Sequence, residues 1–161
     1  MIRKRTDFIK KDNTPPENST ISADFGTVDY CDSYRIRKIT DGDVEAITNQ
    51  IFKAPKWVNG MMKIRDLFVR PFGLKTARET ESDKIFPVIA QTENEIIMGI
   101  NDRHLNFRVS VLIDREKSYI YVTTLVQYNN RFGNAYFLLI KPFHNLIVRS
   151  VMKRLINGSQ S

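Results

Sequence analysis

The fold is decided by residues 101–157, NDRHLNFRVSVLIDREKSYIYVTTLVQYNNRFGNAYFLLIKPFHNLIVRSVMKRLIN. Residues 105–113 alternate apolar and polar side chains, which is the strongest period-two pattern in the chain. Residues 118–128 are dense in β-branched and aromatic residues and predict a returning strand. A helical stripe follows, with Pro142 inside it, where the helix must kink or begin again. The apolar positions of this stripe are Tyr136, Ile140, Phe143, Ile147, Val151 and Leu155.

The preceding residues supply the rest of an α+β fold. A strand is predicted over 27–39, and a helix follows from Thr40 to Pro55. A second helix starts near Lys56, and short strands cover 85–89 and 95–100. Pro87 places the first of these short strands at a sheet edge or a bulge. We therefore predict a helix-grip arrangement, in which a curved antiparallel sheet is covered by a helix pair and a long C-terminal helix.

The chain of 161 residues suits one domain with a proper hydrophobic core. Residues 1–22 are polar and contain Pro15-Pro16, so we interpret them as a flexible N-terminal arm. The folded domain is expected over 23–158, with 159–161 as a tail. The basic start of the chain is followed by no apolar run, which argues against a secretory signal, and no apolar run has the length of a membrane span.

The residue types that build redox and metal sites are scarce. A single cysteine, Cys31, cannot form an internal disulfide, so a cytoplasmic location is expected. With two histidines, His104 and His144, and no Cys-x-x-Cys, no structural zinc site is predicted. The sequence has no glycine-rich phosphate loop and no Gly-x-Ser-x-Gly motif, and we predict no cofactor.

The net charge of +7 favours anionic partners in general. The basic residues are interleaved with acidic ones instead of forming a stripe, so nucleic acid is not an expected partner. A homo-oligomer is left open.

Several strings of residues resemble a bacterial family of uncharacterised domains within the START-like, or SRPBCC, superfamily of helix-grip domains. The resemblance covers about residues 23–157, and its most specific parts are Asp-Arg-His-Leu-x-Phe-Arg at 102–108 and Pro-Phe-His at 142–144. The other matching stretches are 29–34, 55–58, 67–69, 72–74, 99–101, 136–137 and Lys141. The resemblance implies a cavity between the sheet and the long helix for a hydrophobic or amphipathic small molecule. A minority of the superfamily's branches are enzymes.

Two groups of residues are candidates for a site. Asp102, Arg103 and His104 stand at the entry to the best strand, where they would form an acid–base pair or half of a metal site, or simply complete a turn. The second group would line the cavity or fill an ordinary core, and Arg65 in it could anchor an anionic group. Its members are Trp57, Met61, Arg65, Phe107, Tyr128, Phe143 and Ile147.

Three polar residues are judged structural from the sequence. Asp32 interrupts the apolar face of its strand and needs a partner if it is covered. His144 lies about 100° from Phe143 around the helix and would face the helix pair or solvent. Nothing near Cys31 in the sequence would activate its thiol as a nucleophile.

Three functions remain in view. The first is binding of a small amphipathic molecule in the cavity. The second is a small-molecule lyase, cyclase or hydrolase that uses Asp102, Arg103 and His104. The third is a protein- or nucleic-acid-interaction module that uses the basic arm or the edge strand at 85–89.

Overall fold

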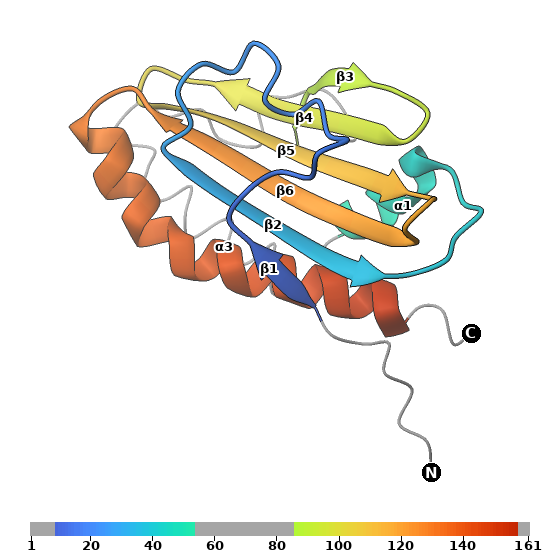
Figure 1. Cartoon of the computed structure of the whole chain (residues 1–161). Coiled ribbons are helices and arrows are strands. Elements are labelled where there is room, and N and C mark those ends of the chain that lie inside the picture. Colours follow the sequence, from blue (N-terminus) through green and yellow to red (C-terminus); the bar gives the residue numbers. More distant parts are fainter. Residues whose placement is uncertain (1–8, 54–85, 158–161) are drawn as a thin grey trace.

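The computed structural model describes residues 9–53 and 86–157, and it confirms the predicted α+β fold. One curved antiparallel sheet has the strand order β1-β2-β6-β5-β4-β3 (Figure 1). Its strands are β1 (Lys10–Asp12), β2 (Tyr30–Arg37), β3 (Val88–Gln91), β4 (Glu95–Asn101), β5 (Leu105–Asp114) and β6 (Tyr119–Tyr128). The two long strands that were clearest in the sequence, β5 and β6, pair along their whole length at the centre of the sheet.

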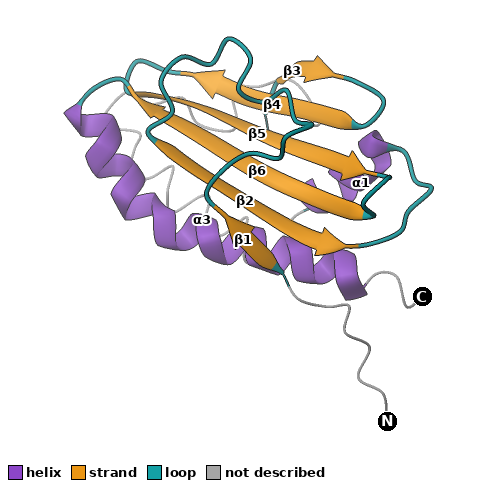
Figure 2. Ribbon diagram, viewed as in Figure 1, coloured by secondary structure: helices purple, strands orange, loops and turns teal. Residues whose placement is uncertain are grey.

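Two helices, α1 (Val44–Phe52) and α3 (Arg131–Asn157), pack on the same face of the sheet (Figure 2). The long helix α3 runs along β2 and β6, while α1 covers β4 and β5 and touches α3. We call this helix-covered side the inner face. The second helix predicted from Lys56 lies outside the described residues.

The main hydrophobic core lies between the inner face and the helices. Alternate residues of β2, β4, β5 and β6 supply it, as in Val109, Val111 and Ile113 of β5. The helices contribute Val44, Ile47 and Ile51 from α1, and Val148, Val151, Met152 and Leu155 from α3. Lys38, just after β2, donates a hydrogen bond of 2.8 Å to the Leu155 carbonyl near the end of α3. This contact satisfies one of the last carbonyls of the helix.

The outer face of the sheet is covered by the chain that precedes β2. This segment forms the edge strand β1 and then crosses the sheet (Figure 1). Ile21 and Phe25 from the segment are buried against Ile97 and Leu125, which forms a second, smaller core. Part of the sequence interpreted as a flexible arm therefore carries an edge strand and a fully buried isoleucine.

Two buried or half-buried charged residues hold this segment in place. The Glu95 carboxylate accepts hydrogen bonds from the Ser19 hydroxyl and from both the backbone N–H and the hydroxyl of Thr20. The Arg108 guanidinium donates to the carbonyls of Ile21, Ala23 and Asp24 and lies 5.1 Å from the centre of the Phe25 ring. The outer cover is thus a fixed part of the fold at these points.

The buried stripe of α3 agrees with the predicted stripe at Val151 and Leu155 and differs from it earlier in the helix. The helix begins at Arg131 and continues through Pro142 as one element. Its buried apolar side chains include Phe137, Val148 and Met152, whereas Phe143 is 50% exposed. The expectation that Phe143 faces the core was wrong. Polar side chains occupy part of the helix face that packs on the sheet, and a search for apolar positions does not detect them.

Candidate functional site

A set of polar contacts runs along the boundary between β2 and α3, inside an otherwise apolar layer. The side chains at 30, 32 and 34 of β2 alternate onto the inner face. They meet 141, 144 and 145 of α3, which are three and four positions apart and share one side of the helix. We call this set, together with Thr124 of β6, the polar seam. Its residues are Tyr30, Asp32, Tyr34, Thr124, Lys141, His144 and Asn145.

Asp32 is the centre of the polar seam and is 0% exposed. Its Oδ2 atom accepts a hydrogen bond of 2.7 Å from the Tyr30 hydroxyl and one of 3.0 Å from His144 Nε2. The contact with His144 assigns the proton to Nε2, because an unprotonated ring nitrogen would face a carboxylate oxygen. A carboxylate placed against an imidazole in this way fixes both the ring orientation and the tautomer.

The other oxygen of Asp32 has no donor. Oδ1 is buried and has no hydrogen-bond partner among residues 9–53 and 86–157. The Thr124 hydroxyl is also buried and has no hydrogen-bond partner within this part of the chain. Asp32 and Thr124 are directly opposite each other on β2 and β6, so their side chains share the inner face and their Cβ atoms are about 5 Å apart. Two unpartnered polar groups therefore stand side by side in the same buried layer.

Asp32 and Thr124 begin a row of directly opposed residues that crosses the sheet, and the side chains change from polar to apolar along it. The row continues from Asp32 and Thr124 to Val109 on β5 and Met98 on β4, each directly opposite the one before. Val109 and Met98 belong to the main hydrophobic core. Along this row the inner face is thus polar on β2 and β6 and apolar on β5 and β4.

Aromatic rings border the polar seam at the start of α3. The Phe137 ring lies 4.7 Å from that of Tyr30 and 5.8 Å from that of Tyr128, between centroids. The Lys141 ammonium lies 4.9 Å from the centre of the Tyr30 ring. Burial first, and then the hydrogen bond to Asp32 and its negative charge, raise the pKa of Tyr30 above its ordinary value. Tyr30 therefore keeps its proton and acts as a donor to Asp32.

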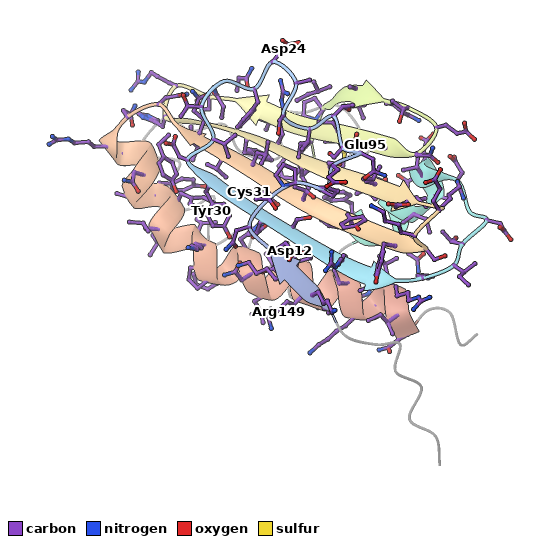
Figure 3. All side chains as sticks on the ribbon, viewed as in Figure 1. Asp12, Asp24, Tyr30, Cys31, Glu95 and Arg149 are labelled. Carbon is purple, nitrogen blue, oxygen red and sulfur yellow. The ribbon has the colours of Figure 1, made fainter. Side chains whose placement is uncertain are left out.

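Cys31 is adjacent to this site in sequence but points the other way. It packs against the smaller core on the outer face (Figure 3). Burial, and to a lesser degree the charge of Asp32, raise the pKa of its thiol to about 11. A thiol that keeps its proton is a poor nucleophile, which agrees with the structural role expected from the sequence.

Asp102, Arg103 and His104 lie in the turn between β4 and β5 and not within the strand. The Asp102 carboxylate accepts a hydrogen bond of 2.6 Å from the backbone N–H of Arg103, the next residue in the turn. The His104 ring contacts the Asn130 side chain through Nδ1 and packs on Phe132 at 4.7 Å between centroids. These contacts account for the three residues as parts of a turn.

The same turn is attached to the start of α3. The backbone N–H of Asn129 donates to the His104 carbonyl at 2.9 Å, and the side-chain amides of Asn129 and Asn130 donate to the Asp102 and Arg103 carbonyls. Asn130 also accepts from the Gly133 N–H at 2.9 Å and caps the helix. The turn therefore fixes the point at which the chain passes from β6 into α3.

The residues predicted to line the cavity lie in different parts of the structure. Phe107 and Ile147 are partly buried and pack against the main core, and Phe107 also meets Phe86 edge-on at 4.7 Å. Tyr128 is half-buried beside Phe137, next to the polar seam. Trp57, Met61 and Arg65 lie outside the described residues.

Neither a metal centre nor a membrane-spanning helix is found in the part of the chain that the structure describes. No group of three or more His, Cys, Asp or Glu side chains there could hold a metal ion. None of the described helices is both long and apolar enough to cross a membrane.

A family model described as "Protein of unknown function (DUF2867)" matches residues 25–151. The chain belongs to the DUF2867 family. The match spans β2 to the last turns of α3 and so includes the whole polar seam. No curated protein and no solved structure matches this DUF2867 chain significantly.

Sequence reasoning considered two members of this site, Asp32 and His144, judged both structural and did not join them. Asp32 was expected to need a partner if covered, and it has one in His144. His144 was expected to face the helix pair or solvent, but its ring contacts Asp32 of β2. The joining signal is the regular spacing of 30, 32 and 34 against 141, 144 and 145, which can be read only once β2 and α3 are known to be neighbours.

Proposed function

We propose that this DUF2867 protein binds a small amphipathic molecule between the inner face of its sheet and α3, as a START-like domain would. The polar end of the molecule would lie at Asp32 and Thr124, and its apolar part along the row toward Val109 and Met98. The α+β architecture and the START-like resemblance support this proposal. The lone Cys31 agrees with a reducing, cytoplasmic setting.

One observation carries the proposal most strongly. Asp32 Oδ1 and Thr124 Oγ1 are both buried and lack partners within the described residues, although they stand on directly opposed positions. An unpartnered buried polar group costs about 1–3 kcal/mol, and a charged group costs more. A bound molecule that donates to both atoms would remove this cost, so the ligand-free arrangement favours binding.

The ligand should be amphipathic because the row of side chains is. Asp32 and Thr124 offer polar atoms, whereas Val109 and Met98 offer apolar surface. Phe107 and Phe86 extend the apolar surface beside Val109. Small-molecule sites commonly combine a mostly apolar lining with a few polar groups that fix orientation.

Native mass spectrometry of protein purified without detergent tests this function. We expect an adduct of small-molecule mass that disappears under denaturing conditions. Val109→Phe should fill the apolar part of the site and abolish the adduct, while Val28→Phe, at an exposed position ahead of β2, should leave it unchanged.

The thermal stability of Val109→Phe separates a cavity from a filled core. If the row borders a cavity, the larger ring is accommodated and the midpoint of unfolding is maintained. If the core is already filled, overpacking should cost about 1–3 kcal/mol. A bare chain mass combined with a destabilised Val109→Phe variant would contradict the proposal.

A further inference from the structure

We propose that the polar end of the ligand is a protonated amine, held between the Asp32 carboxylate and the Thr124 hydroxyl. This inference rests on the proposed function and adds the chemical class of the molecule.

The hydrogen bonds already made at Asp32 indicate that a ligand group bound there would be a hydrogen-bond donor. Oδ2 already receives the Tyr30 hydroxyl and His144 Nε2, while Oδ1 receives nothing within the described residues. An ionised carboxylate can only accept hydrogen bonds. A ligand group that contacts Oδ1 must therefore bring an N–H or an O–H, and a ligand carboxylate or phosphate would instead add charge repulsion.

The charge balance favours a cation over a neutral hydroxyl. Asp32 is fully buried, and the Tyr30 hydroxyl that contacts it is neutral. Lys141 is directed to the Tyr30 ring, 4.9 Å from its centre, and no ion pair joins it to Asp32 within the described residues. His144 Nε2, 3.0 Å from Oδ2, forms an ion pair with Asp32 only when its ring is protonated, and no cation contacts Oδ1 within the described residues. Burial of an uncompensated charge is costly. An ammonium group at Oδ1 would supply the balancing charge.

The surroundings suit an ammonium group in two further ways. The Thr124 hydroxyl can accept one of its N–H bonds, because a hydroxyl has two acceptor lone pairs. The Tyr30 ring, whose hydroxyl contacts Asp32, continues into an aromatic cluster with Phe137 and Tyr128, and cations are attracted to such rings. A carboxylate, a free hydroxyl and an aromatic cluster together form a site for an alkylammonium group with an apolar tail.

Three probes with the same chain length test this inference. Octylamine, 1-octanol and octanoate differ only in the polar group, and their dissociation constants can be compared by calorimetry at neutral pH. We expect octylamine to bind about tenfold or more tightly than 1-octanol, because the hydrogen bond to the carboxylate is charge-assisted. Octanoate should bind weakest.

Substitutions at both partners give independent readouts. Asp32→Asn should remove the preference for octylamine over 1-octanol, whereas Ser33→Ala, the next residue of β2 on the outer face, should keep it. Thr124→Val should weaken octylamine binding and raise the thermal midpoint of the ligand-free protein, because it removes a buried hydroxyl without a partner. This second variant retains a test if Asp32→Asn does not fold.

The outcomes separate this inference from the proposed function. Equal binding of octylamine and 1-octanol, or tightest binding of octanoate, overturns the ammonium assignment while the apolar site stands. Binding of octylamine that Asp32→Asn and Thr124→Val leave unchanged also overturns it. Failure of all three probes, together with a bare chain in native mass spectrometry, overturns the proposed function itself.

Discussion

Replacement of Gly133 by alanine should destabilise the protein, although the same change in an ordinary helix is stabilising. Gly133 lies in the first turn of α3, where alanine is normally favoured over glycine by about 1 kcal/mol. A Cβ atom at this position would lie 2.0 Å from the His104 carbonyl oxygen and 2.8 Å from its carbon. Both atoms belong to the backbone, so no side-chain rotation can relieve the overlap.

The geometry gives the magnitude. The β4–β5 turn and the start of α3 must separate by about 1.4 Å to bring this contact from 2.0 Å to an ordinary 3.4 Å. The hydrogen bond from the Asn129 N–H to the His104 carbonyl, now 2.9 Å, would lengthen to about 4.3 Å and be lost. Loss of this bond costs about 1 kcal/mol, and overpacking adds about 1–3 kcal/mol. After the gain from helix propensity, we expect Gly133→Ala to cost about 1–3 kcal/mol.

Chemical denaturation followed by circular dichroism measures this effect. Asn134→Ala, at the next and exposed position of α3, is the matched control and should change the free energy of unfolding by less than about 0.5 kcal/mol. Unchanged or increased stability of Gly133→Ala would show that the turn at 102–104 is not held against α3. The structural account of Asp102, Arg103 and His104 would then be refuted.

Three further substitutions or treatments test other parts of the structure. Arg108→Met should free the segment over the outer face, with faster limited proteolysis between 13 and 29 and a loss of about 1–3 kcal/mol, while the exposed Arg37→Met should do neither. Glu95→Gln should cost about 2–4 kcal/mol, because an amide group would face the donors Ser19, Thr20 and Ser110, and the exposed Glu93→Gln in the same hairpin is its control. Cys31 should react with iodoacetamide at pH 8 about a hundredfold more slowly in the folded protein than in urea, since its thiol pKa is raised from 9.0 to about 11. The folded state holds the Cys31 proton more tightly than the unfolded state does. The contribution of this thiol to the free energy of unfolding is therefore complete below about pH 9 and is lost as the pH rises through about 11. If Cys31 reacted as fast in the folded protein as in urea, its buried position would be contradicted.

The sheet could be predicted from the sequence because its signals are local. The alternation in residues 105–113 and the β-branched run at 118–128 arise because one face of each strand packs on the core. Such patterns can be recognised without knowing which strand is the neighbour. Pro87 likewise indicated an edge, and β3 does lie at the edge of the sheet, with Val88 and Ile89 40% and 46% exposed. Each of these features lies within a short stretch of chain, so it can be recognised from that stretch alone.

The polar seam could not be predicted because it depends on contacts over long sequence separations. Asp32 and His144 are 112 residues apart, and Tyr34 and Asn145 are 111 apart. The hydrophobic stripe of α3 predicts the buried face correctly at Val151 and Leu155 but not at Phe143, near which polar residues replace apolar ones opposite β2. The Asp-Arg-His string drew attention for the opposite reason, since its residue types suit catalysis while its contacts form a turn.

The most direct test of the ligand site is the position of chemical-shift changes when octylamine is added to the isotope-labelled protein. We expect changes in the backbone amides of residues 30–34, 122–126 and 141–148, and little change at 102–105. Thr124→Val should reduce the changes at 30–34. Changes centred on 102–105, or no changes at any concentration below micelle formation, would contradict the assignment of the site to Asp32 and Thr124.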